Sequence, residues 1–256
     1  MKKSITTFIA VLAMLAFTQH ADAQSTTKTD SVKSKKRNLV KVNVLALPLN
    51  TISLQYERLL TRKISIGLGF STMPKGSIPF KSTFKSLVDD EDTKDQLENL
   101  KTSNLTITPE VRFYLGKGNY KGFYVAPYAR YTRFTAALPY NYDDAGTTKT
   151  INLDGKVTAF TGGLMFGAQW RLSKIVYLDW WIVGGAYGTS KGDLTGTRDI
   201  PLTQNEQDAL RESLNDLKED VPLVKINSDV NENGAKVHVD GPWANLRAGL
   251  SVGIRF

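Results

Sequence analysis

The last ten residues of the chain, RAGLSVGIRF, alternate between apolar side chains and small or charged ones. Apolar residues occupy every second position from Ala248 to Phe256, and Gly, Ser or Arg fill the positions between them. Successive side chains of a β-strand point to opposite faces, so this spacing predicts a strand with one apolar and one polar face. If such strands make up the whole chain, their apolar faces must either pack inward or face lipid.

Seven earlier segments show the same alternation and are separated by turn-forming residues. The eight predicted strands cover roughly residues 38–47, 50–60, 64–70, 105–115, 123–131, 160–170, 176–187 and 243–256. Most are close to the roughly 9–11 residues that a tilted membrane-spanning strand needs, and their number is even. The pattern therefore predicts an all-β fold, an eight-stranded antiparallel up-and-down β-barrel.

Alternation alone leaves open which face of the barrel is outside, because a soluble lipocalin-like barrel has the same pattern with its apolar face inward. Large aromatic residues near the strand ends favour a transmembrane barrel, since such barrels carry aromatic girdles at both interfaces. The polar faces are rich in Gly, Ser and Thr, which suits a tight interior. The girdle residues are Phe70, Phe113, Phe123, Tyr131, Phe160, Trp170 and Phe256.

Charge is sorted between the two ends of the predicted barrel. Three long connections, 74–101, 136–156 and 188–241, hold 20 of the chain's 25 acidic residues but only 13 of its 33 basic ones. The short-turn side is basic, which fits contact with anionic headgroups of an inner leaflet. Because of this distribution, the net charge of +8 indicates a membrane partner rather than nucleic acid. The basic residues are Lys33, Lys35, Lys36, Arg37, Arg58, Arg62, Lys63, Lys117, Lys121, Arg171, Lys174 and Arg255.

The first residues have the features of a secretory signal peptide: a basic start, an apolar run over 5–17, and the small residues Ala21 and Ala23. The run is shorter than the roughly 20 residues of a spanning helix. We expect cleavage after Ala23, then a disordered periplasmic tether at 24–37 and the barrel at 38–256. The chain has no cysteine, so no disulfide framework is expected.

The polar strand faces place seven charged residues in the lumen, and no catalytic, cofactor-binding or metal site is predicted among them. An eight-stranded barrel has an interior just wide enough for side chains, and buried charges must be paired. We therefore expect an ion-pair network that fills the lumen; the alternative is a narrow channel lined by the same groups. The residues are Lys41, Glu57, Glu110, Arg112, Arg130, Asp179 and Arg247.

The long connections are the candidates for a role outside the cell, with an unidentified extracellular ligand as partner. Thr203 and Glu206 have capping-box spacing, and Leu210, Leu214, Leu217 and Val221 continue at helical spacing, so a helix is expected in 188–241. A weaker helix is expected in FKSLVDDEDTKDQLENL, residues 84–100. Packing over the barrel mouth is the favoured role of both helices, and partner binding is the alternative.

The segment DVNENGAKVHVD, residues 229–240, has the spacing of a calcium loop, with Asp240 at the position where Glu is usual. No helix precedes it, and the alternating residues around NENG favour a hairpin instead.

The chain has few of the side chains that usually carry out catalysis. His238 is the one histidine after residue 23, and no Ser or acidic partner for it follows from spacing. A structural or binding protein is therefore favoured, with a narrow channel as the alternative and an envelope enzyme acting at the outer rim as a second one.

Four stretches of the chain resemble an uncharacterised, domain-of-unknown-function family of outer-membrane barrels from Gram-negative bacteria. The resemblance implies the barrel fold and the outer-membrane location, but no activity and no site residues. The final strand also resembles the terminal signal that the barrel assembly machinery reads, with Phe256 as its last aromatic and Ser251 where glycine is common. The four stretches are KVNVLALPLNTISLQYERLLTRKISIGLGF, ITPEVRFYLGKGNYKGFYVAPYARY, TGGLMFGAQWRLSKIVYLDWWIVGGAYG and GPWANLRAGLSVGIRF.

Overall fold

The computed structural model describes residues 36–77, 82, 86, 94, 98–116, 118–198, 200–220 and 223–256. The expected signal peptide and nearly all of the expected tether lie outside these residues, as does most of the expected helix at 84–100. In the part of the chain that the structure describes, no helix is long and apolar enough to cross a membrane.

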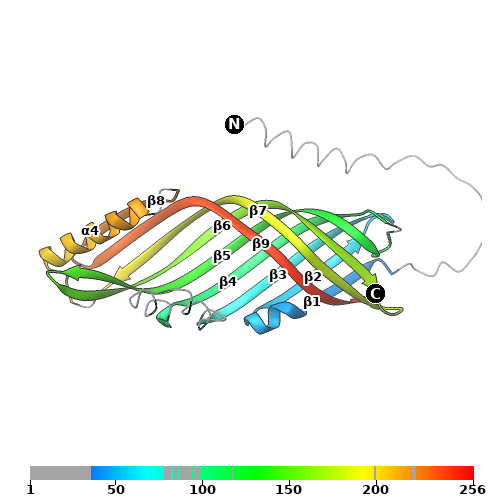
Figure 1. Ribbon diagram of the computed structural model, residues 1–256, viewed down its shortest axis with the longest axis horizontal. Helices are drawn as coiled ribbons and strands as arrows, with labels where there is room; N and C mark the ends of the chain where they lie inside the picture. The colour runs from blue at the N-terminus through cyan, green and yellow to red at the C-terminus, as the bar shows by residue number, and fades with distance from the viewer. Residues whose placement is uncertain are drawn as a thin grey trace, which may run out of the picture. The chain divides into compact units, whose positions relative to one another are not determined.

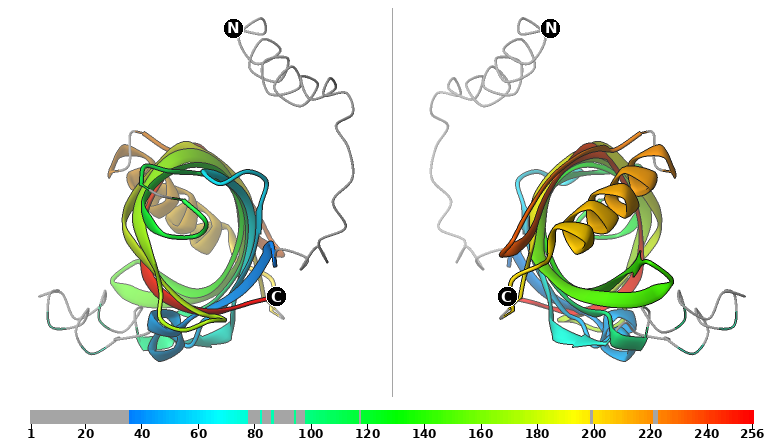
Figure 2. Two further views of the ribbon diagram at one scale, coloured as in Figure 1. Left: turned by 90° about the vertical axis from the view of Figure 1, so that its right-hand side faces the viewer. Right: turned by 90° about the vertical axis from the view of Figure 1, so that its left-hand side faces the viewer.

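Eight antiparallel strands form a closed ring, as the alternation predicts (Figures 1 and 2). The first strand pairs with the last one, and this pairing closes the ring. A further strand, β8 (Lys225–Asn231), pairs with the beginning of β9 only. The ring strands are β1 (Asn38–Asn43), β2 (Ile52–Leu59), β3 (Ile64–Ser77), β4 (Lys101–Tyr114), β5 (Gly122–Asp144), β6 (Thr147–Arg171), β7 (Val176–Thr197) and β9 (Gly234–Arg255).

The C-terminal alternation closes the barrel. In β9, Ile254 pairs with Val40 of β1, and the amide of Phe256 donates to the carbonyl of Asn38 at 2.9 Å. Ile254 and Phe256 are more than half exposed on the outer wall, whereas Ser251 is buried inside it. The period of two therefore separates an apolar exterior from a polar interior at the seam of the barrel.

The first predicted strand is shorter than the alternation suggests. Residues 44–47 belong to a 3-10 helix, η1 (Val44–Leu49), and not to a strand. The side chain of Asn43 caps this helix by accepting from the amide of Leu45 at 3.0 Å, and Asn50 ends it in the left-handed conformation. Pro48 cannot donate to a strand ladder, which explains why the apolar run leaves the sheet here.

The predicted loop at 136–156 is also largely strand. β5 and β6 continue as one hairpin to a two-residue turn at Ala145 and Gly146, both with positive φ, the usual geometry of a tight hairpin. Pro139 and the charged residues weaken the alternation in this segment, so the sequence reads as a loop. The helix at 204–220 packs on this hairpin, and the burial of hairpin residues beneath it stabilises strands that the local sequence pattern does not predict.

One residue lies on the opposite face from the predicted one. Regular alternation along 176–187 predicts that Tyr187 points inward, on the same face as Tyr177 and Asp179, but its side chain is 67 % exposed on the outer wall. The register between β6 and β7 shifts at Gly167, and the register between β7 and β9 shifts between Trp181 and Gly184. Such an irregularity inverts the inside–outside phase of every later residue in the strand.

Beyond the ring, residues 136–156, 188–198, 200–220 and 223–240 form a structure that we call the head. The helix expected in this region is present as α4 (Gln204–Asp220), which crosses one end of the barrel in the end-on view (Figure 2). Its Leu210 and Leu214 are buried against strand residues of the head. The expected hairpin is also confirmed, since Asn231 of β8 pairs with Gly234 of β9. The strand residues of this small core include Tyr142, Ile151, Leu153, Ile226, Val230, Ala235 and Val237.

The start of α4 is held by the predicted capping box and by an ion pair. The carboxylate of Glu206 accepts from the amide and hydroxyl of Thr203 at 2.8 and 2.9 Å, and from Lys149 of β6 at 2.8 Å. The Lys149 bond, with the Thr203 bonds, lowers the pKa of Glu206 from near 4.5 to about 2.

This pKa predicts how the head responds to acid. Since the folded value is depressed, the stabilisation is complete above the ordinary pKa and is lost as pH falls from about 4.5 toward 2. We expect amide exchange in the first turn of α4 to rise over this range, measured by hydrogen exchange with pH-corrected intrinsic rates. Glu206→Gln should show the raised exchange already at pH 7 and no further change on acidification. A wild-type profile that is flat between pH 5 and 2.5 would contradict this.

Candidate functional site

Charged side chains from five strands meet inside the ring. The ammonium of Lys41 lies 2.6 Å from Oε2 of Glu57 and 2.6 Å from Oδ2 of Asp179. Asp179 also accepts from Nη1 of Arg112 at 2.7 Å. All four side chains are completely buried. Each comes from a different strand: Lys41 from β1, Glu57 from β2, Arg112 from β4 and Asp179 from β7. The pairing ties one side of the ring to the other through its interior.

The network continues along the lumen in alternating charge. Nε of Arg112 donates to Glu110 at 2.5 Å, and the other oxygen of Glu110 accepts from Nη1 of Arg247 at 2.6 Å. The Arg247 guanidinium also lies 4.1 Å from the centroid of the Trp181 ring, a cation–π contact. Three cations and three carboxylates are thus matched in one chain of contacts.

Arg130 is the predicted lumen residue that does not join this chain of ion pairs. Its side chain is half-buried, and its hydrogen bonds within the described residues go to neutral groups: Nε donates to Thr108 at 3.3 Å and Nη1 donates to Asn245 at 3.2 Å. The structure therefore brings together six of the seven predicted residues and leaves the seventh with an unmatched charge beside them.

Neutral polar side chains complete the network, and a count of charges alone misses them. Gln55 and Gln169 accept from the two terminal nitrogens of Arg112 at 3.0 and 3.1 Å. The hydroxyls of Tyr114 and Tyr124 donate to Glu57 and Asp179 at 2.7 Å each. Strand parity is the signal that could have found them, because all four occupy inward positions of their strands.

A tyrosine closes the lumen at the end that carries the C-terminus. Tyr120 lies in the short turn after β4, is fully buried, and accepts from the amide of Leu59 at 2.9 Å. Its ring makes edge contacts with those of Tyr114 and Tyr177. Gly118 allows this turn, because a Cβ at its positive φ would collide with the carbonyl of Arg62. Figure 2 shows the turn crossing the barrel opening.

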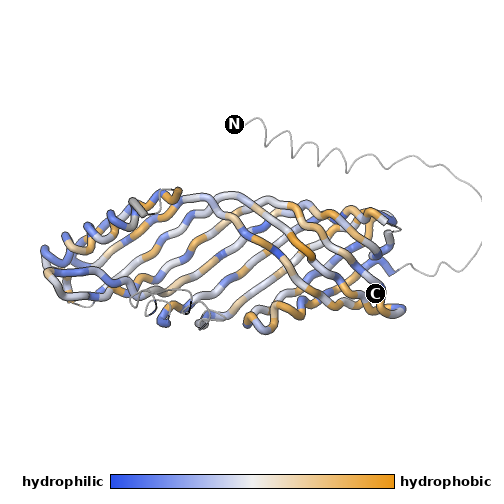
Figure 3. Tube along the Cα trace, viewed as in Figure 1, coloured by the Kyte–Doolittle hydropathy of each residue, from blue (hydrophilic) through white to orange (hydrophobic). Residues whose placement is uncertain are grey.

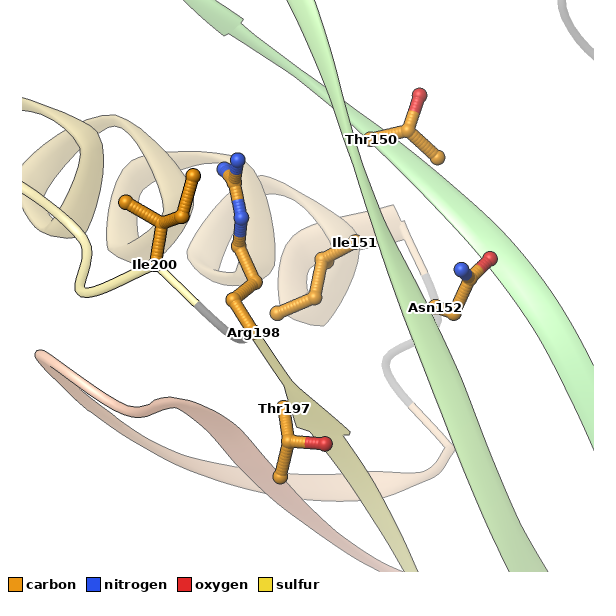
Figure 4. A pocket seen from close by; sticks show the side chains of 6 residues that line it. All are labelled: Thr150, Ile151, Asn152, Thr197, Arg198 and Ile200. Carbon is orange, nitrogen blue, oxygen red and sulfur yellow. The ribbon is translucent and has the colours of Figure 1, made fainter.

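The head holds a shallow pocket of about 280 Å³. Figure 4 shows Arg198 and Ile200, from the segment after β7, and Thr150 and Asn152 from β6. Arg198 donates to the hydroxyl of Tyr142 at 3.3 Å, so it belongs to the packing of the head. Of the described residues that line this pocket, Arg198 is the one with an ionisable side chain.

His238 lies on the surface of the head. Its ring nitrogen is 2.9 Å from Asp193, whose pKa this hydrogen bond lowers, and both side chains are well exposed. Among the described residues, no group of three or more His, Cys, Asp or Glu side chains is placed to hold a metal ion. The residues of the calcium-like motif lie on the two paired strands and the turn of the hairpin.

The fold and the lumen define a closed, eight-stranded antiparallel barrel whose interior is occupied by paired charges. The chain belongs to the family described as a protein of unknown function, DUF3575, whose model matches residues 8–195. This range includes β1 to β6 and all but the last two residues of β7, and it ends before α4, β8 and β9. The uncharacterised family suggested by the sequence is thereby confirmed. A comparison with curated proteins gave no match.

Proposed function

We propose that the protein is an integral outer-membrane barrel of a Gram-negative envelope that conducts no ions and has a structural or binding role through its head. The observation that carries the proposal is the buried charge network, which spans the lumen from Lys41 to Arg247. The side chains of Lys41, Glu57, Arg112 and Asp179 have no exposed surface, which supports a plug rather than a conducting path.

The outer wall supports the membrane location. Large apolar side chains such as Phe160, Phe166 and Trp180 are 62, 52 and 46 % exposed, and water-soluble monomers rarely carry large continuous apolar surfaces. Figure 3 shows hydrophobic positions alternating along the strands in the half that holds β1, β2 and the C-terminus. On β6 they extend from Phe160 to Trp170, about the length of a tilted spanning strand.

The two ends of this apolar band support an orientation. Near the C-terminal end, Trp170 stacks with Trp180 at 6.4 Å, as expected of an aromatic belt at an interface. Exposed basic residues, Arg58, Arg62 and Arg171, lie at the same end. This end would face the inner leaflet and the periplasm, and the head would then lie outside the cell.

Single-channel recording tests the plug directly. The protein, refolded in detergent and shown to insert by co-flotation with phospholipid vesicles, is added to a planar bilayer. We expect no conductance steps, and a porin added afterwards to the same bilayer should produce them. Failure to co-float would refute the membrane location separately. Discrete steps whose size changes in Glu110→Gln would refute the plug and establish a narrow channel.

A further inference from the structure

We propose that the lumen contains a binding site for a small oxyanion, a phosphate or carboxylate group, between Arg130 and Arg247 on the head side of the ion-pair network. Three observations support it: an unmatched positive charge, two buried donors without partners, and solvent contact at the same place. The site does not depend on where the barrel resides, so it stands or falls separately from the proposed function.

The first observation is charge balance. Lys41, Arg112 and Arg247 match Glu57, Glu110 and Asp179 in the buried network. Arg130 adds a fourth cation, and its hydrogen bonds to Thr108 and Asn245 bring no negative charge. A guanidinium held inside a barrel is stabilised by a counter-ion, and within the described residues Arg130 forms no ion pair.

The second observation is a pair of donors without acceptors. The hydroxyl of Tyr128 and Nε of Arg247 are buried and make no hydrogen bond with the described residues. Both guanidinium groups contact the Tyr128 ring: that of Arg130 lies 5.5 Å from the ring centroid, and that of Arg247 lies 5.3 Å from it. Two guanidinium groups, one hydroxyl donor and one free N–H thus gather around a single ring. Leaving buried donors unpaired is costly, so a native site normally supplies an acceptor.

The third observation is access. Arg112, deeper in the network, has no exposed surface, whereas Arg130 keeps partial solvent contact. Asn245 is held by Thr161 at 3.2 Å and in turn orients Arg130, so the guanidinium is positioned from two further strands. Arginine in a fixed orientation recognises carboxylate and phosphate groups through two parallel hydrogen bonds.

Calorimetry with two probes tests the site and distinguishes a free oxyanion from a lipid headgroup as its ligand. The folded protein, in a phosphate-free non-ionic detergent at low chloride, is titrated with inorganic phosphate and with dihexanoylphosphatidylglycerol. We expect Arg130→Gln to weaken binding at least about tenfold, the loss of one charge-assisted hydrogen bond. Arg130→Lys should retain part of the affinity, because it keeps the charge but not the planar fork.

The matched control is Arg133→Gln, the same substitution three residues along β5 at an exposed position. Arg130-dependent binding of inorganic phosphate identifies a free oxyanion as the ligand, and Arg130-dependent binding of the lipid alone identifies a headgroup. The proposal is refuted if Arg130→Gln binds both probes as tightly as the wild type. It is equally refuted if Arg133→Gln loses as much affinity, since binding would then be a surface effect.

Discussion

Replacing Arg112 with Met should destabilise the folded barrel by about 3–5 kcal/mol, the typical cost of removing one partner from a buried ion pair. The Arg112 side chain is fully buried and donates to Glu110, Asp179, Gln55 and Gln169. Without it, three buried carboxylates share the two remaining cations of the network. The effect is measured by urea unfolding of the vesicle-inserted protein, followed by tryptophan fluorescence.

Arg133→Met is the control for this experiment, because it removes an exposed arginine from the same barrel. It should change the free energy of unfolding by less than about 0.5 kcal/mol. Arg112→Lys should fall between the two variants, since an ammonium keeps the charge but cannot make the same set of planar contacts. If Arg112→Met unfolds at the same urea concentration as Arg133→Met, the network does not stabilise the barrel.

Replacing Leu210 with Asp should detach α4 from the head while leaving the ring intact. Leu210 has no exposed surface, so the variant loses roughly 2–3 kcal/mol of hydrophobic burial and places a charge in an apolar core. The ring does not depend on this core, because its closure is made by β1 and β9. We expect rapid proteolysis within 204–220 and increased amide exchange at Ile151 and Val237, with barrel strands unchanged.

Asn215→Asp introduces the same charge at an exposed position of the same helix and serves as the control. It should leave both the cleavage rate and the exchange rates close to those of the wild type. Loss of the folded barrel in Leu210→Asp, detected as loss of the heat-dependent shift on a gel, would contradict the independence of head and ring. Unchanged protection of Ile151 would show that α4 does not cover the head core.

The inward charges could be identified from sequence because strand parity depends only on local geometry. Lys41 and Glu57 lie in short strands, and Asp179 lies in β7 before its register shift, so alternation places all three inside, where burial forces charges to pair. Strand parity does not predict which cation pairs with which carboxylate, because partners such as Lys41 and Asp179 are separated by 138 residues. That contact depends on the order and stagger of the strands around the ring.

Three features of the structure could not be predicted from the sequence, each for a physical reason. The outward position of Tyr187 follows a register irregularity that no residue pattern marks. The long hairpin of β5 and β6 is stabilised by α4, whose Ser213 accepts from the Tyr140 hydroxyl through its carbonyl at 3.0 Å. The unmatched charge of Arg130 depends on the tertiary structure, because the three lumen carboxylates pair with Lys41, Arg112 and Arg247.

The sequence alone determined the number of ring strands, the two faces of most of them, the capped helix and the hairpin, because each depends on contacts between residues close in the chain. Only the tertiary structure decided the closure of β1 on β9, the pairing of the lumen charges and the burial of α4 in the head. These depend on strand register and stagger, which are set by the closed ring as a whole and not by any one segment.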